Sequence, residues 1–506
     1  MTAMRIEIAV PQGHTRHSHA ALAERLRGAG HATRFSLHDA PGCFPAGFRL
    51  LAMLERTIYQ PPLIDMLRPC EFDLRGFDGA ADILIDLTGG AAPRGMRTLA
   101  PLFDRDPSEA AALSAILDGR APELHIVEWF GQGDATRQRA HGLPALEQPY
   151  RANESLARVA ARVNDLLAKT IADISAGLDA GVAVEPSAAQ APCFAAFPRF
   201  AASALAGRVA ARLRRMIEGG EAWRVGWRRA NADAFQQTFS TPNAGYAILP
   251  DDGHRYYADP FLFVRDGRTW LFVEEFPYAT RKGVISVAEV SAAGIVGPPR
   301  PVLEAPFHLS WPFVFERDGE VYMMPEARGG GSLRLYRAER FPDKWVEAHV
   351  LLSDIICSDA SLVEWGGLLW LFLSDSTHGQ SDWDTLRLFH APDLDGPWTP
   401  HRFDPALIDA SQARGAGHFF QRDGVLYRPT QDCRSGYGAG LAICAIERLD
   451  LEGFGQRVVA RFGPKQGQRL QGVHTLNAAG GIEVVDFVGA KSSFQPTGWI
   501  VNHQKP

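Results

Sequence analysis

A hairpin pattern recurs five times in the second half of this 506-residue chain. Each copy carries β-branched and aromatic residues on both sides of a glycine turn, as in YYADPFLFVRDGRTWLFVEEF at 256–276. A period near fifty residues, with two clear strands in each copy and room for two more, is typical of propeller blades. The pattern therefore predicts a five-bladed β-propeller over residues 222–506, closed into a ring with few exposed sheet edges. The turn glycines Gly267, Gly319, Gly367, Gly424 and Gly481 are separated by 52, 48, 57 and 57 residues.

Acidic residues gather at the ends of these hairpins. In the first hairpin, the symmetry of antiparallel pairing puts Asp259 beside Glu274 and Glu275. The same symmetry in the third hairpin pairs Asp359 with Asp375. Because the first strand of each blade lines the central channel of a propeller, we expect these carboxylates to converge at one mouth of the ring.

The second and fourth hairpins add polar residues at the same mouth. Symmetry in the fourth hairpin pairs Ala416 with Asp432. Glu326 in the second hairpin and Gln431 in the fourth end their strands at the place that Glu274 occupies in the first. The other side chains that we expect at this mouth are His308, Trp311, His418, Arg428 and His474.

A pocket built from these residue types suits a sugar, whose hydroxyls take bidentate hydrogen bonds while its C–H face stacks on aromatic rings. Two carboxyls separated by room for a water could also hydrolyse a glycosidic bond with inversion. In the alternative structural interpretation, Asp259, which precedes a proline, caps a turn through its own backbone, and Asp359 does the same. Asp266, Asp318 and Asp423 are predicted as turn residues only. The sequence indicates no cofactor, and no tight ligand spacing favours a metal ion in the channel.

The composition narrows the classes of function. The formal net charge is −6, and the chain lacks the concentrated basic surface that binding to a phosphate backbone requires, so we expect no nucleic-acid partner. Six scattered cysteines without a CxxC pair favour neither a zinc site nor a disulfide framework and fit a reducing cytoplasm. The N-terminus has no apolar region of signal-peptide type, and no run of 18 apolar residues follows. We therefore expect a cytoplasmic protein that does not span a membrane.

The first 175 residues alternate between strand and helix periodicities, which predicts an α/β domain over 1–175. The apolar run ADILIDLTGG at 81–90 is typical of a buried parallel strand that ends at the carboxyl edge of a sheet. Gly89 and Gly90 form no GxGxxG pattern, so an ordinary turn is favoured over a phosphate site. The other predicted strands are 6–10, 32–38 and 123–130, and the predicted helices are 19–30, 108–119 and 154–174.

A linker and a connector helix are predicted over 176–221. Residues 177–192 are rich in Gly, Ala and Pro, and 199–220 has a helical pattern in which arginines flank a mostly alanine stripe. This helix either packs as a connector between the domains or makes weak contact with an anionic membrane surface. Its arginines on that pattern are Arg208, Arg212, Arg214 and Arg215.

The repeats carry a family resemblance. The segments YYADPFLFVRDGRTWLFVEEF, HLSWPFVFERDGEVYMMPEA and LYRPTQDC resemble the propeller-like N-terminal domain of plant glucosamine inositolphosphorylceramide transferases and of many bacterial proteins, across roughly 223–486. That domain is in turn similar in layout to five-bladed glycosidases of the arabinanase, xylosidase and invertase type, whose site uses an Asp base, a second Asp that tunes a pKa and a Glu acid. By position, the resemblance implies Asp259 as the base and Asp359 as the second Asp. The fourth-blade segment ARGAGHFF offers His418 and no carboxylate, so Glu326 would substitute as proton donor.

The first 175 residues resemble, remotely, the N-terminal domain of formyltransferases in the order of elements around ADILIDLTGG and the later helix. That family works with an Asn, a His in an HPSxLP-like loop and a downstream Asp. After Gly90 this chain reads AAPRGMRTLAPLFDRDPSE, which has none of these as such. Because formyl transfer from folate needs the His and the Asp to move protons, the departure predicts a degenerate domain that orients or recruits partners.

Three functions follow, in order of preference. The first is a carbohydrate-active protein of surface-polysaccharide or glycolipid metabolism, whose propeller acts on or binds a glycan or glycolipid precursor as a glycosidase or glycosyltransferase would. The second is a carbohydrate-binding or scaffolding module without catalysis that works beside a glycosyltransferase. The third is N-formylation of a sugar amine by the first domain.

Overall fold

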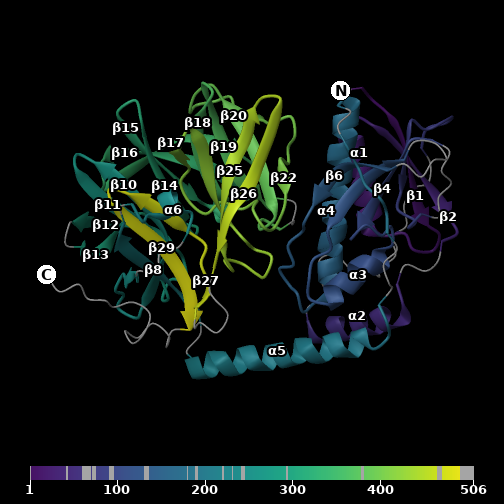
Figure 1. The fold of residues 1–506 in the computed structure, drawn as a ribbon, viewed down its shortest axis with the longest axis horizontal. Helices are drawn as coiled ribbons and strands as arrows, with labels where there is room; N and C mark the ends of the chain where they lie inside the picture. Colours follow the sequence, from purple (N-terminus) through teal and green to yellow (C-terminus); the bar gives the residue numbers. More distant parts are fainter. Residues whose placement is uncertain are drawn as a thin grey trace. The chain divides into compact units, whose positions relative to one another are not determined.

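A computed structural model divides the chain into two compact units, Met1–Ala210 and Ala211–Pro506 (Figure 1). Each unit has its own sheets and its own buried core. The described residues are 2–40, 44–59, 66, 70, 76–90, 96–129, 136–178, 181–187, 192–218, 221–230, 232–240, 245–291, 294–377, 381–463 and 470–490.

The first unit is built on a seven-stranded sheet in the order β2-β1-β3-β4-β5-β6-β7. The strands from β2 to β4 pair in parallel, as the α/β pattern predicts, whereas those from β4 to β7 pair antiparallel. The α/β prediction is therefore confirmed only in part, because apolar periodicity identifies a strand without giving its direction. The strands are β1 (Arg5–Pro11), β2 (Ala32–His38), β3 (Ile83–Asp86), β4 (Thr98–Phe103), β5 (Leu124–Trp129), β6 (Thr136–Gly142) and β7 (Val182–Ala183).

Helices accompany this sheet. The longest, α4, buries Leu156, Val159, Val163 and Leu167, which recur at helical spacing along one face. Within the described ranges, no helix is both long and apolar enough to cross a membrane. The helices are α1 (His17–Gly28), α2 (Ala46–Ile58), α3 (Glu109–Leu117), α4 (Ala152–Ser175) and α5 (Ala196–Glu218), the last of which crosses the boundary between the units.

The second unit is a five-bladed propeller, which confirms the prediction from the repeats. The first four blades follow the chain in order. They are β10 (Arg255–Arg265), β11 (Arg268–Pro277), β12 (Val284–Ser291) and β13 (Gly294–Leu303); β14 (Ser310–Arg317), β15 (Glu320–Glu326), β16 (Ser332–Arg340) and β17 (Lys344–Ser353); β18 (Cys357–Trp365), β19 (Leu368–Asp375), β20 (Thr385–Ala391) and β21 (Thr399–Pro400), with β22 (Leu407–Ile408) beside β20; and β23 (Phe420–Arg422), β24 (Val425–Gln431), β25 (Leu441–Asp450) and β26 (Gly453–Phe462).

The fifth blade closes the ring by joining the two ends of the propeller sequence. Here β8 (Glu221–Arg229), which precedes the first repeat, pairs along its length with β29 (Ile482–Ala490). A buried ion pair between Arg228 Nε and Glu483 Oε1, 2.9 Å long, holds the two strands together. The blade is completed by β9 (Ala247–Ile248), β27 (Leu470–Gly472) and β28 (Leu476–Ala479), and the unit also contains α6 (Phe235–Thr238) and the short helix Arg328–Gly330.

The aspartates of the hairpin turns are turn residues, as predicted. Asp266 and Gly267 both have positive φ, 51° and 72°, which is the conformation of a type I′ hairpin turn. Asp318 and Asp423 have φ of 53° and 51° at the same place in their hairpins. All three side chains are exposed.

The innermost strands carry a bulge at their start, which the sequence did not reveal. Asp259, Trp311 and Asp359 have φ of 47°, 49° and 54°, and the pairing register shifts at each of them. Strain of about 1–3 kcal/mol for each such residue is thereby concentrated at one end of the ring. The shift also corrects the predicted register in the third blade, since Asp375 pairs with Cys357 rather than with Asp359.

Candidate functional site

A cavity of about 330 Å³ opens at the end of the propeller where the innermost strands begin. Its volume lies within the range of small-molecule sites, and its wall combines carboxylates, basic side chains and aromatic rings. Every blade contributes to this wall. The lining residues are Trp223, Tyr256, Asp259, Glu274, His308, Ser310, Glu326, Arg328, Asp359, Trp383, Arg414, Tyr437 and His474.

Asp259 occupies the bulge of β10. Its Oδ2 accepts a hydrogen bond from the backbone N–H of Trp311 at 3.1 Å, and its Oδ1 accepts one from the Thr475 hydroxyl at 3.0 Å. His474 Nε2 lies 3.6 Å from Oδ1. Burial raises the pKa of Asp259 to about 6, although the nearby His474 charge lowers it. This carboxyl group therefore changes charge close to neutral pH, as a general base must.

Acids of one blade also hold the backbone of the next. Asp486 Oδ2 accepts a hydrogen bond from the Asp259 N–H at 3.1 Å, and Asp259 in turn accepts from Trp311. Glu326 Oε2 accepts from the Asp359 N–H at 3.1 Å. Each of the three acceptors binds the bulge residue of the following blade. Asp259 and Glu326 therefore have a structural role in addition to any role in binding or catalysis.

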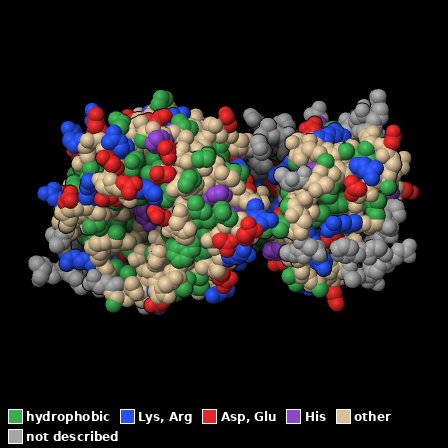
Figure 2. Space-filling model, turned by 90° about the horizontal axis from the view of Figure 1, so that it is seen from above, with side chains coloured by type: hydrophobic (Ala, Val, Ile, Leu, Met, Phe, Trp, Pro, Cys, Tyr) green, Lys and Arg blue, Asp and Glu red, His purple; other side chains and the backbone are tan. Residues whose placement is uncertain are grey.

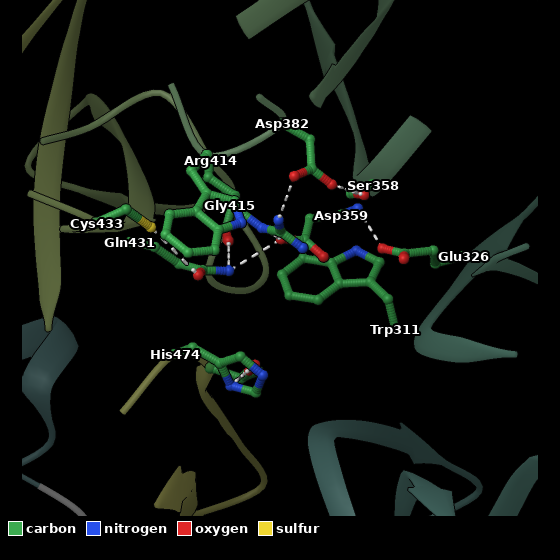
Figure 3. A network of polar contacts seen from close by, with 12 residues as sticks. Trp311, Glu326, Ser358, Asp359, Asp382, Arg414, Gly415, Gln431, Cys433 and His474 are labelled. Carbon is green, nitrogen blue, oxygen red and sulfur yellow. Dashed lines mark hydrogen bonds and ion pairs between the residues drawn. The ribbon is translucent and has the colours of Figure 1, made fainter. Parts of the chain in front are cut away.

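Asp359 belongs to a buried ionic network (Figure 3). Its Oδ2 accepts hydrogen bonds from Arg414 Nε at 2.5 Å and from Gln431 Nε2 at 2.9 Å. Arg414 Nη1 also lies 3.2 Å from Asp382 Oδ1, and Arg328 pairs with the other oxygen of Asp382. Although burial raises the pKa of Asp382, the two guanidinium groups hold it below its usual value. The network therefore keeps Asp359 and Asp382 fixed and partnered by cations.

The pKa values of two glutamic acids in the cavity wall are raised, whereas that of Asp382 is lowered. Burial raises the pKa of Glu274 well above its usual value, and the charges of Asp259 and Glu326 raise it further. Burial raises the pKa of Glu326 well above its usual value too, with the Asp359 charge as the next cause. His308 Nε2 lies 3.3 Å from Glu274 Oε1, and burial lowers the pKa of this histidine. Both shifts favour the protonated form of the side chain, which is the form that can donate a proton.

Aromatic rings form another part of the wall. Trp223 stacks on His474, with ring centroids 3.8 Å apart and planes 13° from parallel. The Tyr437 ring packs edge-on against Trp223 with ring centroids 6.2 Å apart, and its centroid lies 5.7 Å from that of Trp383. His474 is fixed in this stack by Asp486, whose Oδ2 lies 2.6 Å from Nδ1. Rings held beside hydrogen-bonding groups suit a sugar, which has an apolar face and a polar rim.

The structure brings together some of the predicted site residues. Asp359 in the bulge of β18 lies at the same mouth as Asp259, as do Glu274 at the end of β11 and Glu326 at the end of β15. The predicted residues that line the cavity are Asp259, Glu274, His308, Glu326, Asp359 and His474.

Three predicted acids do not line the cavity. Glu275, Asp375 and Asp432 each pair with an arginine outside it. In its hairpin each of them follows by one residue the position that Glu274 occupies, so the alternation of side chains along a strand turns it to the other face of the sheet. The predicted opposition of Ala416 and Asp432 is likewise absent, since Ala416 N–H binds the carbonyl of Pro429. The three arginines are Arg255, Arg387 and Arg434, respectively.

The remaining predicted residues lie behind the wall. Trp311 is fully buried, and its Nε1 donates to the Ala360 carbonyl at 2.9 Å. His418 lies 4.4 Å from the Phe313 ring, and burial lowers its pKa to about 4. Arg428 Nη2 donates to the Ala413 carbonyl at 2.7 Å, and Gln431 Nε2 donates to Asp359 from behind the wall.

Sequence reasoning missed several residues of the wall. Arg414 of the wall and its ion-pair partner Asp382, which does not itself line the cavity, lie in connections between strands, where no position of the repeat points to them. Trp223 and Tyr437 come from β8, which precedes the first repeat, and from the segment between β24 and β25. The available signal was the arginine in the segment ARGAGHFF, which stands directly before the fourth hairpin.

Comparison with known proteins confirms the resemblance of the propeller. Residues 242–475 match the family described as glucosamine inositolphosphorylceramide transferase 1, N-terminal. The rice (Oryza sativa subsp. japonica) protein glucosamine inositolphosphorylceramide transferase 1 is 36% identical over 230 residues, which are 44% of this chain and 31% of the relative. The Arabidopsis thaliana protein of the same name is 37% identical over 201 residues, 39% of this chain and 26% of the relative. The match thus spans about a third of the curated relatives' length or less.

Solved structures with detectable likeness include glycoside hydrolases at much lower similarity. The family 117 glycoside hydrolase Zg3597 of Zobellia galactanivorans shares 12% identity with a TM-score of 0.35, over 53% of this chain and 91% of that one. The catalytic domain of the Coprinopsis cinerea GH62 α-L-arabinofuranosidase shares 13% identity with a TM-score of 0.36, over 53% and 97%. This level is too low to transfer the role of any residue. The resemblance of residues 1–175 to formyltransferases stays a prediction.

Proposed function

We propose that the propeller is a carbohydrate-active enzyme of glycolipid or surface-polysaccharide metabolism, and that its cavity binds a sugar and cleaves or transfers its glycosidic linkage. The observation that carries this proposal is that Asp259 and Glu326 line one cavity and that burial raises the pKa of both. Asp259 has a pKa of about 6, while burial raises the pKa of Glu326 well above its usual value. Carboxyl groups with perturbed pKa values that meet in one cavity are candidates for the base and the acid of one reaction.

The roles follow from the contacts. Asp259 takes a proton from the attacking water or hydroxyl group, whose oxygen forms the new bond to the anomeric carbon. Glu326 gives its proton to the glycosidic oxygen as that bond breaks. Asp359, fixed by Arg414 and Gln431, is the second Asp, and its charge is among the causes that raise the pKa of both Asp259 and Glu326.

Glu274 is the competing proton donor. The pKa of its side chain is raised as well, and its Oε1 has no hydrogen-bond partner among the described residues. One carboxyl oxygen of Glu326 accepts the Asp359 N–H, whereas Oε1 of Glu274 accepts no hydrogen bond from the described residues. The two acids therefore differ in how many oxygens are available to a substrate. We expect Glu326→Gln to reduce turnover more than Glu274→Gln at neutral pH, with fold content unchanged by circular dichroism. The reverse order would give the donor role to Glu274.

We propose a glycolipid as the substrate class, since the relatives carry the name glucosamine inositolphosphorylceramide transferase 1. A second observation in the first unit supports this. The face of α2 leaves Leu50, Met53, Leu54 and Ile58 exposed, and its one acidic residue, Glu55, is buried.

Helix α5 lies along α2 and extends the same kind of surface. The Phe197 ring covers Gly47, and the Arg208 guanidinium stacks 4.3 Å from the Tyr59 ring. Leu205 is exposed on α5, as is Val209. Exposed apolar side chains among arginines, without exposed acids on α2, favour an anionic bilayer as the occupant of this surface.

Vesicle sedimentation tests this contact with the full chain. We expect binding to vesicles of equal parts phosphatidylcholine and phosphatidylglycerol, weaker binding to phosphatidylcholine alone, and loss of binding in Leu54→Asp. Leu451→Asp, which changes an equally exposed leucine of the propeller, is the matched control. Equal binding of both variants would exclude this surface.

The rival function is carbohydrate binding without catalysis, beside a glycosyltransferase partner. The structural role of Asp259 and Glu326, each of which accepts a hydrogen bond from the backbone of the next blade, favours this function. Among the described residues, no carboxylate of the fourth blade lines the cavity, which favours it as well. Mass spectrometry of a library of oligosaccharides, glycolipids and nucleotide sugars, incubated with wild type or Asp259→Asn, separates the two functions. Product from wild type alone supports the enzyme. Retention of sugars by both proteins without product supports the binding module and overturns the proposed catalysis.

A further inference from the structure

A second cluster of ligand-type side chains lies in the first unit. His125 on β5 and His141 on β6 are direct cross-strand partners, and their ring centroids lie 4.9 Å apart. Glu123 precedes β5 by one residue, and its carboxylate reaches the same side of the hairpin. One ligand atom from each of the three residues lies within 4.8 Å of the other two. Imidazole nitrogens with a carboxylate oxygen are a donor set typical of zinc.

The environment of His125 fixes which ring nitrogen is available. Its Nδ1 lies 2.7 Å from Gln138 Oε1, an oxygen that can only accept, so Nδ1 must carry the proton. In the neutral ring, Nε2 then presents a lone pair. This atom is buried and has no hydrogen-bond partner in the part of the chain that the structure describes. Glu123 Oε2, at 3.8 Å, is beyond hydrogen-bonding distance from it.

A bound cation would supply the missing partner. Histidines that bind metals usually donate their other ring N–H to a carbonyl or carboxylate oxygen, which is the position that Gln138 occupies here. Glu123 and His141 are exposed, so that their side chains can close around an ion without disturbing the core, while His125 is held in place by burial. Three protein ligands leave a fourth, open coordination position.

We propose that Glu123, His125 and His141 bind a zinc-class divalent cation and that Gln138 positions His125 for it. Two nitrogen ligands disfavour calcium and magnesium, which prefer all-oxygen sites. Because the ligands come from both strands, the ion clamps β5 to β6 and stabilises the antiparallel half of the sheet. This site is independent of the propeller cavity and of the proposed function.

The experiment uses the full chain, freed of metal by a chelator and dialysis and then titrated with Zn²⁺ by calorimetry and with Co²⁺ by visible absorption. We expect one specific site per chain, Co²⁺ bands of a four-coordinate ion, and a higher melting temperature with Zn²⁺. His141→Ala and Glu123→Ala should each weaken Zn²⁺ binding at least about tenfold. Both residues are exposed, so neither variant is expected to unfold the unit.

Two further variants sharpen the test. Gln138→Leu removes only the acceptor of the Nδ1 proton, and we expect it to weaken Zn²⁺ binding by about 10–100-fold while one site per chain remains. His17→Ala changes an exposed histidine of α1 and should leave binding as in wild type. If His141→Ala and His17→Ala bound Zn²⁺ equally well, or if wild type took up no stoichiometric Zn²⁺, the proposal would be overturned.

Discussion

Aspartates with the same backbone conformation stand at the two ends of the first inner strand. Asp259 has φ of 47° at its mouth end, and Asp266 has φ of 51° at its turn end. The Asp259 side chain is 9% exposed and accepts hydrogen bonds from two groups, whereas the Asp266 side chain is 91% exposed and lies 3.8 Å from Arg265. Residue type and backbone strain are therefore not enough to make a site. What distinguishes the mouth is burial together with convergent polar partners.

The largest expected effect is on turnover. In Asp259→Asn the amide oxygen can still accept the Trp311 N–H, but the side chain can no longer take a proton. We expect turnover to fall about 10²–10⁴-fold, the usual contribution of a general base, while circular dichroism shows that the fold is retained. Asp266→Asn, at the turn end, should retain full turnover. Initial rates of product formation measure both, and equal rates in the two variants would remove the distinction between the two ends.

The next largest effect is on stability. Arg414→Ala leaves Asp359 and Asp382 buried without their shared cation, and breaking a buried pair in this way costs about 3–5 kcal/mol of unfolding free energy. Arg448→Ala is the matched control, because Arg448 pairs with Asp450 on the exposed surface. Urea denaturation followed by tryptophan fluorescence compares the two. Equal denaturation midpoints would mean that the mouth network tolerates loss of its cation as easily as the surface does.

The mouth should also give stability a pH dependence. In the folded protein burial raises the pKa of Asp259 to about 6, whereas an unfolded aspartate titrates near ~3.9. Between these values the folded state binds more protons, so the contribution of Asp259 to the unfolding free energy falls as the pH rises from about 4 to about 6.

Asp259→Asn removes this contribution. Its stability relative to wild type should therefore increase as the pH rises through that interval, by at most about 3 kcal/mol, and stay constant above it. Denaturation at several pH values between 4 and 8 measures the difference. The same difference at every pH would show that Asp259 titrates normally and would weaken its proposed role as base.

The two ends of the strand were not equally predictable from sequence. A turn is a local feature, and the sequence Asp266-Gly267 predicts its conformation because both residue types tolerate positive φ. The number of blades follows from the spacing of such turns. The arrangement of the mouth depends on bulges such as the one at Asp259, which no residue type predicts. Symmetry about the turn therefore placed Glu274 at the cavity correctly but gave Asp375 the wrong pairing partner.

The other omissions have related causes. Arg414 and Asp382 lie outside the repeated hairpins, and their importance comes from contact with Asp359, which only the folded ring creates. Closure of the ring by β8 was invisible because that strand precedes the first repeat and pairs with β29, some 250 residues later. In the first unit, periodicity located β5 but could not show that it runs antiparallel to β4. Sequence patterns thus predicted what neighbours along the chain determine and missed what distant segments determine.

The smallest expected effect lies at the turn end. Asp266→Ala places a residue with a Cβ and no local polar side chain in the left-handed region, which costs about 1 kcal/mol. Asp318→Ala and Asp423→Ala repeat the change in two other blades and should give similar losses by urea denaturation. Sugar retention and turnover should be unaffected in all three, because these side chains are exposed and do not line the cavity. A loss of retention in Asp266→Ala alone would mean that β10 transmits changes from its turn to Asp259, and the two ends of the strand would then have to be treated as one functional element.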